Sequence, residues 1–176
     1  MYRIKDDKRV RLSAELICDG LKQCLQNKSI ADISVIEVAS VSGVGRSTFY
    51  RLFDAPVDVL TYMCDSMVSE MMSSGMHPDK NDSDAWNLHF LKFMMDHSDI
   101  LESVLRSGRP DILYRAFSVL REAHSALDSR LDDKELEYLN ASFAAVMCSI
   151  LYVWNRTGKT ETARDLLDIF RKFPSI

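Results

Sequence analysis

Apolar residues recur along most of the chain at spacings of three, four and seven positions, which is the pattern of helices with one buried face. Between residues 8 and 26, for example, Val10, Ile17, Leu21 and Leu25 fall on one side of a helix. The composition, with Leu, Met, Ala and Glu, suits helices more than strands, so we expect almost no sheet. The pattern predicts an all-α fold of about nine helices, at about residues 8–26, 34–42, 46–53, 56–74, 84–97, 99–106, 110–128, 133–156 and 160–172.

The second and third of these helices are short and lie close together. Ser34 and Glu37 have the spacing of a capping box, in which each side chain hydrogen-bonds the backbone N–H of the other residue. Gly43 supplies the backbone freedom that ends the second helix and turns the chain. In the third helix we expect Phe49, Leu52 and Phe53 to face inward and Ser47, Tyr50 and Arg51 to face outward.

Two short helices joined by a tight turn predict a helix-turn-helix, whose second helix can enter the major groove of DNA. Arg46 can donate two hydrogen bonds to guanine, Ser47 can bond either base type, and Thr48 can contact the thymine methyl group. Tyr50 and Arg51 can reach phosphates. The pattern alone leaves a second interpretation open, in which the pair is an ordinary helical hairpin within a bundle.

Residues 9–60, about a third of the chain, resemble the DNA-binding domain of the TetR family of bacterial transcription regulators. The resemblance rests on Val38-Ala39 in the second helix, Gly43-Val44 in the turn, and the run from Thr48 to Phe53 in the third helix. It implies a helix-turn-helix domain at residues 1–54 and a helical effector-binding and dimerisation domain at residues 55–176.

The resemblance also implies roles for individual residues. Those expected to contact bases or phosphates are Ser34, Arg46, Ser47, Thr48, Tyr50 and Arg51. The sequence departs from the family pattern at three positions. Gly45 replaces a Ser or Thr helix cap, Leu52 lies where a polar residue is common, and Pro56 lies where a phosphate-binding lysine is usual.

The charge distribution separates the two ends of the chain. The net charge is −4, but residues 1–55 hold nine Lys and Arg against seven Asp and Glu, for +2, and the remainder holds thirteen against nineteen, for −6. A cluster of cations precedes and begins the first helix, and it suits either a phosphate-binding arm or a solvated tail. These cations are Arg3, Lys5, Lys8, Arg9 and Arg11.

The middle helices are rich in methionine and aromatic side chains, which adapt to varied shapes and can line a pocket for a small apolar or amphipathic effector. Ordinary core packing is the alternative for each of them. The candidate pocket residues are Met63, Met67, Trp86, His89, Phe90, Phe93, Met94, Phe117 and Trp154.

The helix at 133–156 carries an apolar repeat with small residues beside it, which would let a second helix approach closely. With the final helix it is expected to form a homodimer interface, although the same surface could instead be covered within one chain. The candidate interface residues are Leu139, Phe143, Val146, Met147, Ile150, Leu166 and Phe170.

Other function classes find less support in the sequence. We expect no transmembrane segment, which needs about 18 or more uncharged apolar residues, and a cytoplasmic protein with reduced cysteines. The four histidines show no metal-ligand spacing, and no catalytic motif is present, so we expect no enzyme, no metal and no cofactor.

The sequence therefore predicts a TetR-like regulator, most simply a repressor that a small molecule releases from a palindromic operator. The alternatives are a helical dimeric interaction protein whose helix-turn-helix no longer binds DNA or, with less support, an enzyme.

Overall fold

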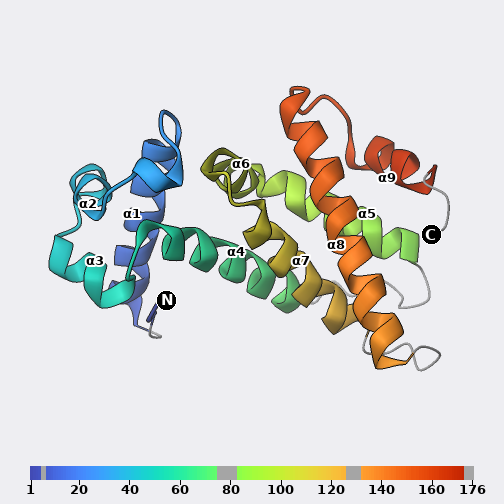
Figure 1. The fold of residues 1–176 in the computed structure, drawn as a ribbon, viewed down its shortest axis with the longest axis horizontal. Coiled ribbons are helices and arrows are strands. Elements are labelled where there is room, and N and C mark those ends of the chain that lie inside the picture. Colours follow the sequence, from blue (N-terminus) through green and yellow to red (C-terminus); the bar gives the residue numbers. More distant parts are fainter. Residues whose placement is uncertain (5–6, 75–82, 126–131, 173–176) are drawn as a thin grey trace. The chain divides into compact units, whose positions relative to one another are not determined.

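The computed structural model describes residues 1–4, 7–74, 83–125 and 132–172. Within these ranges the chain is all-α, with nine α-helices, one short 3-10 helix and no strands (Figure 1). The helices are α1 (Lys8–Leu25), η1 (Ile30–Asp32), α2 (Val35–Ser42), α3 (Arg46–Leu52), α4 (Pro56–Ser73), α5 (Ser83–Asp96), α6 (Ser98–Ser107), α7 (Pro110–Ser125), α8 (Asp133–Arg156) and α9 (Ala163–Arg171).

The predicted all-α class and the expected helices are confirmed, with ends that differ by up to three residues within the described ranges. The 3-10 helix η1 was not expected from the sequence, because three residues are too few to show a helical period. The residues between the predicted helices at 56–74 and 84–97 lie almost entirely outside the described residues, as does the stretch that follows α7.

The chain divides into two compact units. Unit 1 comprises Met1–Ser66 and Glu102–Ile112, and unit 2 comprises Met67–Leu101 and Leu113–Ile176. The division into domains after residue 54 stays a prediction, and the compact units do not coincide with it. Unit 1 also includes the first part of α4 and most of α6.

Unit 1 is held together by packing around the inner face of α3. Phe49, Leu52 and Phe53 are buried, as predicted. The rings of Phe49 and Phe53 lie 5.7 Å apart, and Tyr62 meets Phe53 edge-on at 5.7 Å. Each ring removes a large apolar area from water, so these contacts fix the orientation of α3 within the unit.

Unit 2 is organised around an aromatic cluster. Trp86 stacks on Phe90 at 5.6 Å, while Phe117 and Phe143 meet Phe90 edge-on at 5.0 and 5.5 Å. Arg171 of α9 also binds Asp84 of α5 at 2.7 Å, which holds α9 against α5.

We expected no uncharged run long enough to cross a membrane, and α8 corrects this expectation. Residues 138–155 are uncharged, and by length and composition α8 could cross a membrane. Only 33% of its most apolar window is buried within the chain. One face of α8 packs in unit 2, through residues such as Phe143, Met147 and Leu151. The other face therefore leaves apolar and small side chains at the surface.

Candidate nucleic-acid interface

Helix α2 begins at the predicted cap, but only half of the predicted capping box forms. The Ser34 hydroxyl accepts a hydrogen bond from the Glu37 backbone N–H at 3.2 Å. The Glu37 carboxylate instead binds Lys28 Nζ at 2.8 Å, and this pairing raises the pKa of Lys28. The lysine from the preceding segment competes for the carboxylate, and it supplies a charged donor in place of a neutral backbone N–H.

The turn between α2 and α3 depends on two glycines in different ways. Gly43 ends α2 with a φ of 68°, in the left-handed region that favours glycine. Gly20, in the middle of α1, allows α2 to approach, since a Cβ atom at residue 20 would lie 2.7 Å from the Cβ of Ser42. The close crossing of α1 and α2 therefore requires glycine at position 20, and it sets where the turn and α3 lie.

Helix α3 separates an apolar inner face from a polar outer face. Arg46, Ser47 and Arg51 are exposed, Tyr50 is 50% exposed, and Thr48 is half-buried. Among the described residues, Arg46 and Arg51 make no hydrogen bond or ion pair that would hold them against the protein. Their guanidinium groups remain available to an external acceptor.

Leu52, which departs from the TetR-family pattern, has a structural role in this chain. Its side chain is only 1% exposed, so it belongs to the core of unit 1 and not to the outer face of α3. Pro56 is the first residue of α4, where its missing N–H costs no helical hydrogen bond.

Part of the cationic cluster at the beginning of the chain is bound to the protein itself. Arg3 is paired with Asp54 at 2.7 Å, which lowers the pKa of Asp54, and its backbone N–H donates to the Leu52 carbonyl. An isolated antiparallel bridge joins Tyr2 to Phe53. The beginning of the chain is therefore attached to the end of α3, and Arg3 is engaged by the protein.

The remaining cations lie on α1 or outside the described residues. Lys8, Arg9 and Arg11 are exposed on the first turns of α1, and Lys5 falls outside the described residues. Asp7 caps this helix by accepting hydrogen bonds from the backbone N–H groups of Arg9 and Val10. These turns form a second cationic region of unit 1, near the positive end of a helix dipole.

Most of the predicted effector residues are core residues. Met67, Trp86, Phe90, Met94, Phe117 and Trp154 are buried in unit 2, and Met63 is buried in unit 1. Phe93 and His89 are half-buried, and Phe93 stacks on His97 at 4.1 Å. The Nε2 atom of His89 is buried without a hydrogen-bond partner among the described residues.

The predicted dimer residues divide between two faces of their helices. Phe143 and Met147 are 7% and 0% exposed, and Ile150 and Leu166 are also buried, so the protomer itself covers most of these side chains. Leu139 is exposed, and Val146 and Phe170 are half-buried. The apolar repeat predicted for residues 133–156 thus corresponds mainly to the inner face of α8.

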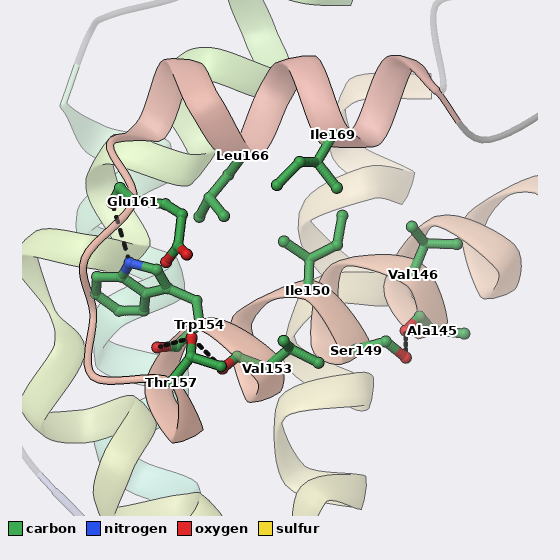
Figure 2. Close-up of a pocket in the computed structure, with 10 residues that line it drawn as sticks. All are labelled: Ala145, Val146, Ser149, Ile150, Val153, Trp154, Thr157, Glu161, Leu166 and Ile169. Atoms are coloured by element: carbon green, nitrogen blue, oxygen red, sulfur yellow. Dashed lines mark hydrogen bonds between the residues drawn. The ribbon is translucent and has the colours of Figure 1, made fainter.

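An apolar groove, with a volume of about 470 Å³, runs between α8 and α9 (Figure 2). Ile150 lies at its base between Leu166 and Ile169 of α9 and Val146 of α8, and Trp154 and Glu161 close one end. Trp154 Nε1 donates to the Glu161 carbonyl at 3.1 Å. No sequence pattern indicated this groove, because its two walls come from separate helices.

The comparisons with known proteins concern the fold. No protein-family model matches the sequence, and no curated protein matches it. Among solved structures, Lin0861 from Listeria innocua aligns with a TM-score of 0.77 at 14% identity, covering 97% of this chain and 93% of that chain.

Two further structures are described as TetR-family transcriptional regulators. The regulator from Streptococcus agalactiae aligns with a TM-score of 0.66 at 20% identity, over 93% of this chain and 94% of that chain. The regulator from Streptomyces coelicolor aligns with a TM-score of 0.55 at 16% identity, over 89% and 76%. Because these alignments extend over both compact units, the chain has the fold of TetR-family transcriptional regulators.

Proposed function

We propose that this protein is a DNA-binding transcription regulator that acts as a homodimer on a palindromic operator in the bacterial cytoplasm. The observation that carries the proposal is the outer face of α3, on a chain with the fold of known regulators. That face presents two arginines, a serine and a tyrosine, while the opposite face is anchored by buried aromatic rings.

The proposed base reader is Arg46, at the first position of α3. Its exposed guanidinium can donate two parallel hydrogen bonds to the O6 and N7 atoms of guanine. Ser47 lies beside it and can donate to or accept from a neighbouring base. Thr48 is half-buried, so its contribution is limited to the edge of the contact.

Phosphate contacts would come from several elements of unit 1. Tyr50 and Arg51 lie on the outer face of α3, and Ser34 caps α2 with a hydroxyl that can still donate. The cations on the first turns of α1 add positive charge. Few such contacts are available to one chain, so binding by a single copy would be weak and strongly reduced by salt.

Dimerisation offsets this weakness, and the exposed side of α8 supports it. Tyr138, Leu139, Tyr152 and Val153 are exposed there, and Ile169 of α9 is 40% exposed beside the groove. The interface is therefore proposed on this outward face. Of the residues predicted from the sequence, Leu139, Val146 and Phe170 are accessible enough to take part.

Release by a small molecule is the proposed mode of regulation, which makes the protein a repressor. The aromatic cluster of unit 2 favours a mainly apolar effector. The buried Nε2 of His89, which has no hydrogen-bond partner in the described part of the chain, favours one hydrogen-bonding group on that effector. A coupling free energy of about 1–3 kcal/mol between effector and DNA would change the DNA affinity about 5- to 150-fold.

The DNA-binding proposal can be tested with the purified full chain and a library of random DNA duplexes. Selection should recover a palindromic site, and Arg46→Ala should weaken binding to that site by about 1–3 kcal/mol, which fluorescence anisotropy would measure. Binding to unrelated DNA should change much less. Arg164→Ala, which removes an exposed arginine of α9, is the matched control. Equal affinities of wild type and Arg46→Ala for the selected site would contradict the assignment of the base reader.

A further inference from the structure

We infer that two copies of this chain pair through α8 in an antiparallel register centred on Ala145, with Tyr138 of each copy closing the α8–α9 groove of the other. The inference rests on the homodimer proposed above. It adds the orientation, the register and the individual contacts of the interface.

The outward face of α8 carries a regular stripe of exposed residues. The spacings along it alternate between three and four, as in a coiled coil, so the residues form one line along the helix. The stripe consists of Glu135, Tyr138, Ser142, Ala145, Ser149, Tyr152 and Arg156, and all seven are exposed.

This stripe reads almost the same from its two ends. From the N-terminal end the order is Glu, Tyr, Ser, Ala, and from the C-terminal end it is Arg, Tyr, Ser, Ala, with Ala145 shared as the centre. At 1.5 Å per residue, Glu135 lies about 15 Å and Arg156 about 16 Å from Ala145 along the axis. The stripe is therefore complementary to an antiparallel copy of itself.

A two-fold axis at Ala145 brings like residues together in the middle and opposite charges together at the ends. Tyr138 then lies beside Tyr152 of the partner subunit, and Ser142 lies beside Ser149 of the partner subunit. Alanine and serine at the centre let the two backbones approach closely. Glu135 meets Arg156 of the partner subunit twice, once at each end, as an isologous interface requires.

A parallel pairing would place Glu135 near Glu135 of the partner subunit and Arg156 near Arg156 of the partner subunit, which like-charge repulsion opposes. The charge pattern therefore selects the antiparallel arrangement. The two charged ends also have room for new contacts. Glu135 uses Oε2 to cap α8 through the Asp132 N–H, which leaves Oε1 for the arginine, and Arg156 lies over the Tyr152 ring at 5.9 Å.

The groove beside the stripe supplies an independent indication. Its lining includes Ala145, Ser149 and Val153 of α8, so the groove borders the stripe (Figure 2). At its end, Glu161 Oε2 is buried without a hydrogen-bond partner among the described residues. A buried carboxylate oxygen without a donor is costly, so a donor brought by a second protomer would stabilise this end of the groove.

In the antiparallel register that donor is Tyr138 of the partner subunit. Tyr138 lies seven residues before Ala145, so in the pair it is level with Tyr152 and Val153, next to the end of the groove. It is 68% exposed in the protomer, an unusually exposed position for a tyrosine on an apolar face. Its ring would cover Val153 and its hydroxyl would donate to Glu161 Oε2.

The register can be tested by exchanging charges between two versions of the full chain. Arg156→Glu leaves two glutamates facing each other at each end of its own dimer, and Glu135→Lys leaves a lysine facing an arginine. Sedimentation should show the dimer dissociation constant raised at least tenfold for each variant alone. An equimolar mixture should recover a dimer close to the wild type, because each contact then joins opposite charges.

The loss of the Glu135 cap cannot explain such a recovery, because the mixture contains the same uncapped chain. Lys92→Glu, which reverses a charge on α5 outside the stripe, is the matched control and should leave the dimer unchanged. If the wild type dimerises but the mixture gains nothing over the separate variants, the register is overturned and the proposed dimer stands. A wild type that remains monomeric at micromolar concentration overturns both.

The groove contact has its own test in a double-mutant cycle. Tyr138→Phe keeps the ring and removes the donor, and it should weaken the dimer about three- to tenfold in sedimentation. The same substitution should have little further effect in a Glu161→Ala chain, since the acceptor is then gone. Tyr114→Phe, at an exposed tyrosine of α7, is the control. Equal effects of Tyr138→Phe in the two backgrounds would show that this hydroxyl does not bind Glu161.

Discussion

Helices α3 and α8 each bury one face and expose another, but their exposed faces have opposite chemistry. The outer face of α3 is polar and cationic, with arginines at both ends of a seven-residue helix. The outer face of α8 is uncharged over its centre and carries opposite charges at its two ends. The first is suited to a uniform negative polymer, and the second is suited to an inverted copy of itself.

This difference shows that the inner faces of the two helices say little about their partners. Both inner faces are apolar, with Phe49 in unit 1 and Phe143 in unit 2 each packed among aromatic rings. Only the exposed side chains distinguish a helix that can contact DNA from one that can contact protein. If the inner and outer faces act separately, substitutions on the two faces should have different effects.

The largest effect is expected from removing a buried ring of α3. Phe49→Ala leaves a cavity at a fully buried site and should lower the free energy of unfolding of unit 1 by about 3–5 kcal/mol, measured by urea denaturation. Tyr50→Ala, on the outer face of the same helix, is the control and should change stability by less than about 1 kcal/mol while weakening DNA binding. Similar stability losses in the two variants would mean that α3 does not separate its two faces.

A smaller effect is expected where α1 and α2 cross. Gly20→Ala places a methyl group 2.7 Å from the Cβ of Ser42, so the helices must move apart, at a cost of about 1–3 kcal/mol in the free energy of unfolding. Because this crossing positions the turn, DNA affinity should also fall. Dimerisation through α8 should not change.

Gly45→Ala is the matched control for this substitution. A Cβ atom at residue 45 would meet only the Ser47 hydroxyl, at 4.0 Å, and the φ of −61° suits any residue. Its cost should stay below about 1 kcal/mol, because alanine is a poorer helix cap than glycine. Equal stabilities of the two variants would contradict the close crossing.

The smallest effect concerns the pH dependence of unit 2. Arg171 holds the pKa of Asp84 below its ordinary value of 3.8, so folding favours the charged form of this carboxyl. The stability that the pair contributes is present above pH 3.8 and is lost as the pH falls through the lowered pKa. Both side chains are about half exposed, so solvent screens the pair and the contribution is small.

Thermal denaturation between about pH 5 and pH 2 would measure this contribution. Asp84→Asn should lose less stability than the wild type over that interval, because its side chain does not take up a proton. Asp96→Asn, at the other end of α5, is the control. An unchanged acid response in Asp84→Asn would show that the ion pair with Arg171 contributes nothing measurable.

Much of unit 1 could be predicted from the sequence because its signals are local. The Ser34 cap, the glycine that ends α2 and the inward positions Phe49, Leu52 and Phe53 are all set by residues within a few positions of one another. The predicted capping box was wrong in part, because a residue outside α2 competes for the Glu37 carboxylate. Glu37 pairs with Lys28 instead of completing the box. Gly20 gave a signal that could have been used, because glycine inside a helix is costly unless another backbone comes close.

Unit 2 was harder to predict from the sequence because its sites join residues that are far apart in the chain. The apolar repeat of α8 correctly predicted a helix, but periodicity does not say which of two apolar faces is buried by the protomer. Phe143 fell on the inner face because α5 supplies the rings of Trp86 and Phe90, which pack against it, and Met147 is buried on the same face. The predicted effector residues likewise lie mostly in the core.

By itself, the sequence determined the all-α class, the expected helices and the polar outer face of α3, because helical period, caps and turn residues act over short distances. Tertiary structure alone decided that α1 and α2 meet at Gly20, and that the outward face of α8 carries the stripe from Glu135 to Arg156. It also decided that Glu161 Oε2, at the end of a groove, has no donor among the residues that the structure describes. The physical reason is that burial and hydrogen-bond satisfaction depend on all neighbours in space, and most of those neighbours come from other helices.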